Sequence, residues 1–90
     1  MVVYETLQFS DDFIESYASR EFSASDRRRI LRALRLLDTN EQHPSLRVHQ
    51  LEREMRGRWS ASASDELRIV FERLDGGRKR LIECNRHYRR

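Results

Sequence analysis

The hydrophobic period of the sequence changes once, at its only proline, and this change indicates the fold class. Before Pro44, apolar residues recur every three to four positions, as in helices that bury one face. After Pro44 they alternate with polar residues, as in strands that bury one face. Helices and strands that are segregated along a chain indicate an α+β fold with the helices packed on one face of an antiparallel sheet.

The first part of the chain predicts one strand and one helix. Residues 2–8 are rich in β-branched and aromatic types and predict a strand. Ser10 can cap a helix over roughly residues 11–20, because two acidic residues follow it and complement the helix dipole. The residues on the predicted buried face of this helix are Phe13, Ile14, Tyr17 and Ala18.

A second helix is predicted to begin at Ser23 or Ser25 and to end at Thr39 and Asn40. Ser23 with Asp26 three residues later resembles a capping box. The predicted buried stripe of this helix consists of Ile30, Ala33, Leu34 and Leu37.

Alternating residues after Pro44 predict three to four antiparallel strands. The predicted strands cover residues 46–51, 59–63, 67–72 and 80–84. Turns are expected at residues 55–58, 64–66 and 75–77, and Asp75-Gly76-Gly77 is a hairpin signal. Trp59 and Cys84 are interpreted as core residues, and His43 as a loop residue.

The alternation also predicts which side chains share the uncovered face of the sheet. If Leu67 and Ile69 face the helices, Arg68 points to the opposite face. By the same rule Arg47 and His49 lie opposite Val48. We therefore expect Arg47, His49 and Arg68 to converge on a free face that could bind RNA.

Size and cysteine content limit the kinds of site that the chain can build. Its 90 residues predict one domain over residues 1–90. A chain this short buries only about 60% of its unfolded surface, so any chemistry should occur on an open surface or in a shallow cleft. The single cysteine excludes an intramolecular disulfide and suits the reducing cytosol. The sequence shows no export signal and no long apolar run, so we expect a cytoplasmic protein without membrane contact.

Positive charge is concentrated in the second half of the chain. Residues 1–45 contain six arginines and eight acidic residues, whereas residues 46–90 contain eleven arginines, Lys79 and seven acidic residues. The net charges are −2 and +5, and the basic half indicates an anionic partner such as RNA. The alternative is a solvated, arginine-rich surface with no specific partner.

Four segments carry a family resemblance. They are residues 43–51, 57–61, 65–71 and the pair His87-Tyr88. In this order and spacing they resemble the RelE/ParE superfamily of type II toxins, closest to the YafQ-like and RelE-like mRNA interferases. The chain departs from the family at Arg53, where the family often has glycine, and offers only Ser60, Ser62 or Ser64 where YafQ-like proteins have a further histidine.

The resemblance implies a ribosome-dependent endoribonuclease that cleaves translated mRNA in the ribosomal A site and inhibits translation. Cleavage by the 2′-hydroxyl needs a base, an acid and cations that stabilise the phosphate, and it needs no metal or other cofactor. Histidine suits both proton roles, and arginine suits the phosphate. The catalytic residues that the resemblance implies are His49, Asp65, Arg68 and His87. The residues expected to contribute RNA binding are Arg47, Lys79, Arg86, Tyr88, Arg89 and Arg90.

Other interpretations remain open for these residues and for the function. Asp65 can be a turn-forming residue, and Arg68 can be a surface charge that faces Glu72 or Glu83. A ParE-like toxin would inhibit DNA gyrase without cleaving RNA, and an inactive module would keep only the toxin fold. For an active toxin the resemblance implies a cognate antitoxin and a toxin–antitoxin hetero-oligomer.

Overall fold

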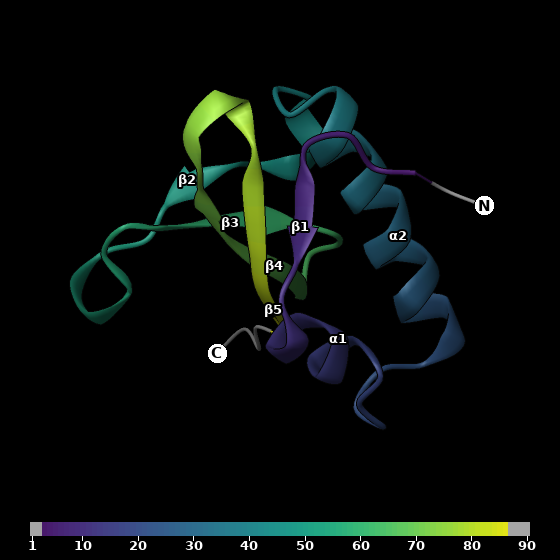
Figure 1. The fold of residues 1–90 in the computed structure, drawn as a ribbon. Helices are drawn as coiled ribbons and strands as arrows, with labels where there is room; N and C mark the ends of the chain where they lie inside the picture. The colour runs from purple at the N-terminus through teal and green to yellow at the C-terminus, as the bar shows by residue number, and fades with distance from the viewer. Residues whose placement is uncertain (1–2, 87–90) are drawn as a thin grey trace.

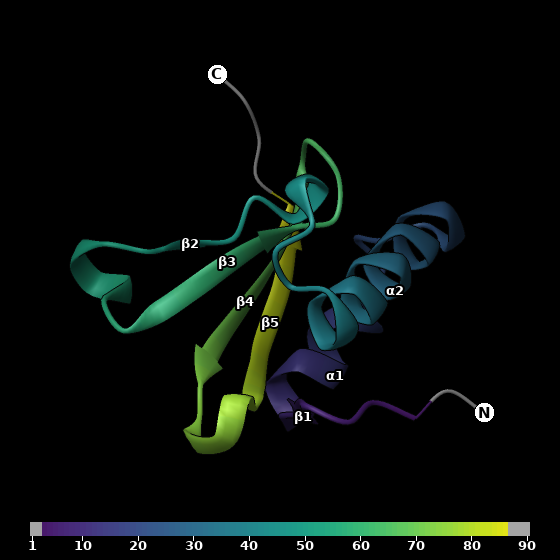
Figure 2. The ribbon, with the colours of Figure 1, turned by 90° about the horizontal axis from the view of Figure 1, so that it is seen from above.

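The chain folds into a five-stranded sheet with two helices on one face, as the computed structural model shows for residues 3–86 (Figure 1). The view from above separates the helix layer from the sheet (Figure 2). The strand order is β1-β5-β4-β3-β2; neighbours from β2 to β5 are antiparallel, and β1 is parallel to β5. The elements are β1 (Leu7–Phe9), α1 (Asp11–Tyr17), α2 (Ala24–Thr39), β2 (His49–Gln50), β3 (Arg58–Ser62), β4 (Leu67–Arg73) and β5 (Lys79–Arg86). The predicted α+β fold is confirmed.

Helix α1 begins where the sequence predicts but ends early. The Ser10 hydroxyl accepts a hydrogen bond from the backbone N–H of Phe13 at 3.0 Å, so the predicted cap is confirmed. Phe13 is buried, whereas Ile14 is 52% exposed and Ala18 is exposed, so the predicted burial of these two residues is wrong. A helix of two turns that packs on β5 buries only a narrow face, and Ile14 is rotated by about 100° from Phe13.

Helix α2 matches the prediction from cap to buried face. The Ser23 hydroxyl accepts from the N–H of Asp26, and the Asp26 carboxylate accepts from the N–H of Ser23, both at 3.0 Å. Asn40 follows the last turn as the C-terminal cap. All four residues of the predicted stripe are buried: Ile30, Ala33, Leu34 and Leu37.

The first strand is shorter than predicted. Residues 3–6 are not part of the sheet, and β1 begins at Leu7. The backbone N–H groups of Glu5 and Thr6 donate to the Asp38 carboxylate of α2 at 3.1 and 2.7 Å, so these donors are not used to pair with a strand. The capture of these donors by a helix side chain explains why strand propensity failed here.

The strand predicted at residues 46–51 is mostly absent. Pro44–Leu46 forms a 3₁₀ turn whose histidine cap accepts from the N–H of Ser45. Arg47 then adopts a left-handed conformation with φ of 46°, and this interrupts the extended backbone before β2. The later strands and the turn at residues 75–77 are confirmed, with β5 longer than predicted.

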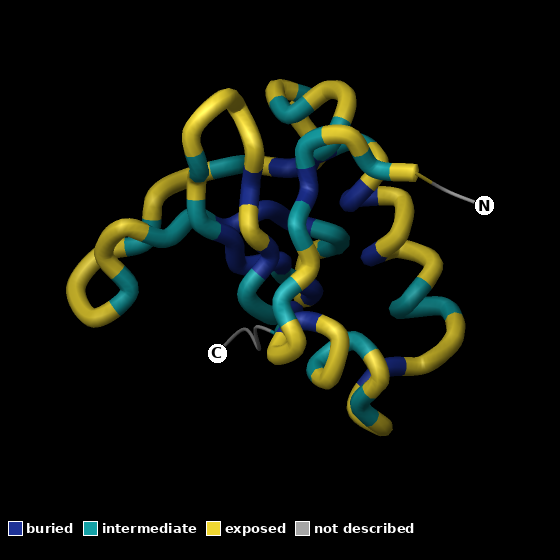
Figure 3. The backbone as a smooth tube through the Cα atoms, in the orientation of Figure 1, coloured by how far each residue is buried: buried dark blue, intermediate teal, exposed yellow. Residues whose placement is uncertain are grey.

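The core lies between the helices and the sheet (Figure 3). Its largest fully buried side chains are Phe13, Ile30, Leu34, Leu37, Leu46, Leu67, Ile69, Phe71 and Leu81. Cys84 is buried with them, and burial raises the pKa of its thiol. Trp59 packs at the core margin beneath the Arg73 guanidinium. In the described part of the chain, no helix is long and apolar enough to cross a membrane.

Candidate functional site

The strand register sets two rows of polar side chains on the sheet face that no helix covers. Directly paired residues of antiparallel strands point to the same face. One row contains Ser62, Arg68 and Asn85. The adjacent row contains His49, Ser60, Val70 and Glu83. Four strands therefore contribute to one surface.

A shallow pocket of about 280 Å³ lies where these rows meet. Its lining residues are His49, Leu51, Met55, Ser60, Arg68, Val70 and Asn85. The predicted meeting of His49 and Arg68 on the free face is confirmed, and the roles of both residues in catalysis stay predictions. An open pocket of this size, with polar and apolar walls, suits part of a nucleotide and not a large enclosed ligand.

Arg68 is oriented by the backbone of the turn before its own strand. Its Nη1 atom donates to the carbonyl oxygens of Ser64 at 2.8 Å and of Leu67 at 3.2 Å. Within residues 3–86 it forms no ion pair, so no carboxylate of this part of the chain binds it directly. The Nε and Nη2 donors of a fixed cation are left for an anionic ligand.

His49 is exposed, and its ring is held in one tautomer by a backbone contact. Its Nδ1 atom lies 2.8 Å from the carbonyl oxygen of Arg47. A carbonyl oxygen only accepts, so Nδ1 carries the proton and Nε2 of the neutral ring has a free lone pair. His49 is therefore prepared to accept a proton at Nε2.

Asn85 is a pocket residue that the sequence interpretation missed. Its Nδ2 atom donates to Oε2 of Glu83 at 3.1 Å. Because a carboxylate only accepts, this contact fixes which end of the amide faces Glu83 and leaves the amide oxygen for a ligand. The only available signal was the predicted pairing of the last two strands, and a bulge between Val70 and Phe71 changes that pairing.

Solved structures with this architecture exist, although no family model and no curated protein sequence matches the chain. The YoeB/ParE toxin from Agrobacterium tumefaciens aligns over 93% of this chain and 100% of its own, with 22% identity and a TM-score of 0.72. The DinJ–YafQ toxin–antitoxin complex of E. coli aligns over 94% of both chains, with 14% identity and a TM-score of 0.72. The RelBE2 toxin–antitoxin complex of Mycobacterium tuberculosis aligns over 94% and 100%, with 18% identity and a TM-score of 0.61.

The chain shares the fold of these solved toxin structures. The fold that the sequence resemblance implied is therefore confirmed over nearly the whole chain. Identities of this size establish the fold, and the site depends on the residues of this chain.

Two residues predicted for the site lie elsewhere in this toxin fold. Arg47 lines a separate hollow with Trp59 and Arg73, so its predicted place beside Arg68 is wrong. The left-handed backbone at Arg47 breaks the alternation from which that place was inferred. Asp65 is exposed in the predicted turn and does not line the pocket.

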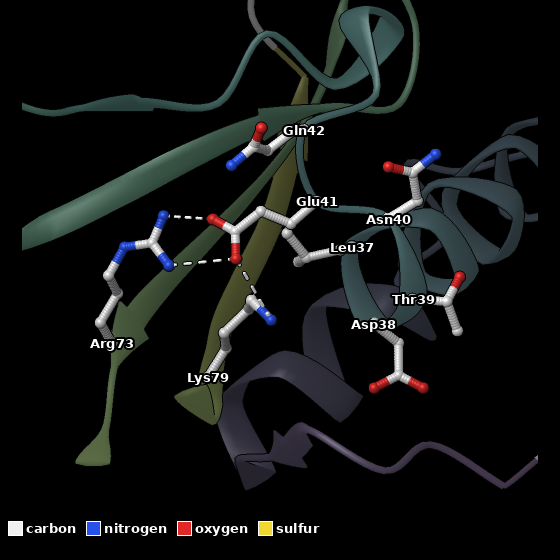
Figure 4. A pocket seen from close by; sticks show the side chains of 8 residues that line it. All are labelled: Leu37, Asp38, Thr39, Asn40, Glu41, Gln42, Arg73 and Lys79. Atoms are coloured by element: carbon white, nitrogen blue, oxygen red, sulfur yellow. Dashed lines mark hydrogen bonds and ion pairs between the residues drawn. The ribbon is translucent and has the colours of Figure 1, made fainter. Parts of the chain in front are cut away.

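Two basic residues predicted to bind RNA are engaged by carboxylates. Lys79 is 3% exposed and pairs with Glu41 at 3.4 Å, beside Arg73 (Figure 4). Arg86 donates to Glu66 at 2.9 Å and to Asp26 at 2.5 Å. These contacts occupy both cations, so we do not include them in the proposed site. The predictions for His87, Tyr88, Arg89 and Arg90 lie outside the described residues.

Proposed function

We propose that this chain is a type II toxin that cleaves translated mRNA on the ribosome. The observation that supports this proposal best is the shared pocket of His49 and Arg68 on a RelE/ParE toxin fold. One residue offers a proton-accepting nitrogen, and the other offers a cation that forms no ion pair among residues 3–86. These are two of the three groups that RNA cleavage by its own 2′-hydroxyl requires.

In the proposed reaction His49 Nε2 takes the proton of the 2′-hydroxyl. The 2′-oxygen then forms a bond to the adjacent phosphorus, and the bond from phosphorus to the 5′-oxygen breaks. Arg68 binds the non-bridging oxygens, on which negative charge accumulates in the transition state. The 5′-oxygen leaves with a proton, for which the family resemblance proposes His87. The products are a 2′,3′-cyclic phosphate and a 5′-hydroxyl end.

We propose a cognate antitoxin as the partner of this chain. Several structural neighbours are toxin–antitoxin complexes, among them YoeB–YefM from Staphylococcus aureus, DinJ–YafQ and RelBE2. The exposed polar pocket of this chain would be a target for an antitoxin segment that blocks access to His49 and Arg68. The proposed place of action is the cytoplasm, where translated mRNA is available.

The test is to induce the chain in bacterial cells and to map new mRNA 5′ ends. Wild type is compared with His49→Ala, Arg68→Gln and His87→Ala. Arg20→Gln is the matched control, because Arg20 is exposed and outside the pocket. We expect new ends inside translated codons for wild type and control, and a strong loss of these ends for the three site variants.

Three results would contradict the proposed mechanism. Undiminished cleavage by folded His49→Ala and His87→Ala proteins would exclude the assigned proton transfers. Growth arrest without new mRNA ends would favour the gyrase-inhibiting alternative, and a DNA supercoiling assay would then decide it. Harmless expression of a folded protein would leave only the binding-module alternative.

A further inference from the structure

A second groove, of about 410 Å³, lies between α2, the 3₁₀ turn at Pro44–Leu46 and the end of β3. Three arginines of α2 line it: Arg29, Arg32 and Arg35. Apolar side chains, among them Leu36 and Leu46, also contribute to the lining. Among residues 3–86 no acidic residue lines it, so a basic rim surrounds an apolar floor.

The three arginines form a regular stripe along the helix. They are spaced by three residues, so they lie on one face and span roughly 9 Å at 1.5 Å per residue. Within residues 3–86, Arg29 is the only one of the three that forms an ion pair, with Asp26 at 3.7 Å. Asp26 is already bound by Arg86, and among residues 3–86 neither Arg32 nor Arg35 forms an ion pair. Their positive charge is therefore available to a ligand.

His43 contributes a neutral donor to the same groove. Its Nδ1 atom accepts from the N–H of Ser45 at 3.2 Å. In the neutral ring the proton is then on Nε2, which can donate to an oxygen. The groove thus combines fixed cations with a ring donor.

We propose that this groove is a second RNA-binding site whose arginines bind successive phosphates of one RNA strand. Guanidinium groups match phosphate oxygens in pairs, and an apolar floor can accept the face of a base. A row of cations at regular intervals fits a polyanion better than it fits an isolated anion. The proposal rests on the proposed function, because it takes RNA as the substrate.

The register connects the two sites. Ser62 at the end of β3 lines the groove, and its direct partner on β4 is Arg68, which lines the pocket. An RNA strand can therefore pass around the end of β3 from one site to the other. The bound phosphates can belong to the mRNA or to ribosomal RNA, since the chemistry is the same.

The test compares two double variants with the same loss of charge. Arg32→Gln with Arg35→Gln alters the groove, whereas Arg20→Gln with Arg28→Gln alters exposed arginines that do not line it. Glutamine is a good helix former, so α2 should be retained, and circular dichroism checks this. The probes are a fluorescein-labelled 2′-O-methyl uridine decamer, which has no free 2′-hydroxyl and cannot be cleaved, and purified ribosomes without mRNA.

For the decamer we measure affinity by anisotropy at several salt concentrations. Each phosphate contact contributes roughly 0.7 to the slope of log affinity against log salt for a single strand. We expect the groove variant to make this negative slope shallower by about 1.4, and the control variant to change it much less. A loss confined to the decamer assigns the groove to mRNA, and a loss confined to ribosome co-sedimentation assigns it to ribosomal RNA. Equal effects of both variants, or no effect of either, would overturn the proposal.

Cleavage is measured separately, so the two proposals can fail independently. If the wild-type protein makes no new mRNA ends but the groove variant binds RNA more weakly than wild type, the nuclease proposal is refuted and the groove proposal is retained. If the wild-type protein cleaves mRNA and the groove variant binds both probes normally, the groove proposal is refuted and the nuclease proposal is retained.

Discussion

Replacing Lys79 with methionine tests whether this residue supports the fold or contacts RNA. The side chain is almost fully buried, and its Nζ atom lies 3.3 Å from Oγ1 of Thr6 and 3.4 Å from Oε1 of Glu41 (Figure 4). Methionine keeps an unbranched apolar stem, so the change removes the charge without opening a large cavity. Loss of these polar contacts should lower the free energy of unfolding.

The structure sets the size of this effect. A hydrogen bond to a charged group contributes about 1.5–3 kcal/mol. The carboxylate of Glu41 keeps Arg73 as a partner and is 26% exposed, so it is not left as an isolated buried charge. Removing the buried ammonium also removes its desolvation cost. We expect a loss of about 2 kcal/mol, which corresponds to a fall in Tm of roughly 8–16 °C for a domain of this size.

The assay is urea unfolding by circular dichroism, together with decamer binding at a temperature where both proteins are folded. Lower stability with unchanged RNA affinity is the expected result. Unchanged stability with weaker RNA binding would refute the structural role and restore Lys79 to the RNA interface. A double-mutant cycle with Glu41→Gln isolates the pair, and a coupling energy of about 1 kcal/mol is expected for residues in contact.

Three further changes test other parts of the molecule. Arg53 has a φ of 60°, so Arg53→Gly should raise stability by about 0.5–1 kcal/mol, and a lower Tm would contradict this. Burial alone would raise the pKa of Asp38, but hydrogen bonds from Thr6 and Glu5 hold it below its ordinary value. This carboxylate therefore stabilises the fold above the pKa of the unfolded chain, and the effect is lost as pH falls through the folded pKa. Asp38→Asn should lower stability near neutral pH and weaken its acid dependence, as urea unfolding from about pH 2 to 7 would show. Asn85→Ala should slow mRNA cleavage by roughly three- to tenfold with Tm nearly unchanged, and equal activity would remove Asn85 from the site.

Most of the fold could be predicted because local signals and burial agree. The cap of α2 and its buried stripe at Ile30, Ala33, Leu34 and Leu37 follow from spacing alone. The failures occur where a distant group competes for the backbone. Asp38 takes the N–H groups of residues 5 and 6, and a left-handed residue at Arg47 shortens β2. Neither the contacts of Asp38 nor the left-handed backbone at Arg47 can be inferred from the periodicity of the sequence.

The sequence interpretation missed Asn85 of the pocket for a similar reason. Near the turn the register pairs Phe71 with Leu81, and a regular continuation would place Arg68 opposite Cys84. The bulge after Val70 shifts the pairing by one residue, so that Arg68 faces Asn85. This shift turns Cys84 into the core and keeps Glu83 out of it. Burial of a charged group is costly, which favours the bulge, but sequence alternation alone does not place it.

Two arginines of neighbouring strands show why the structure is needed to decide which arginine could bind a phosphate. Arg86 is paired with Leu67, so it points to the helix side, where Asp26 and Glu66 bind it. The hydrogen bonds that Arg86 donates to Glu66 and to Asp26 raise its pKa, and the two carboxylates neutralise its field. Arg68 follows Leu67 in β4, so it points to the opposite face, where its guanidinium donates to backbone carbonyls. A phosphate that enters the pocket therefore meets at Arg68 a positive charge that forms no ion pair among residues 3–86, in the same pocket as the free nitrogen of His49.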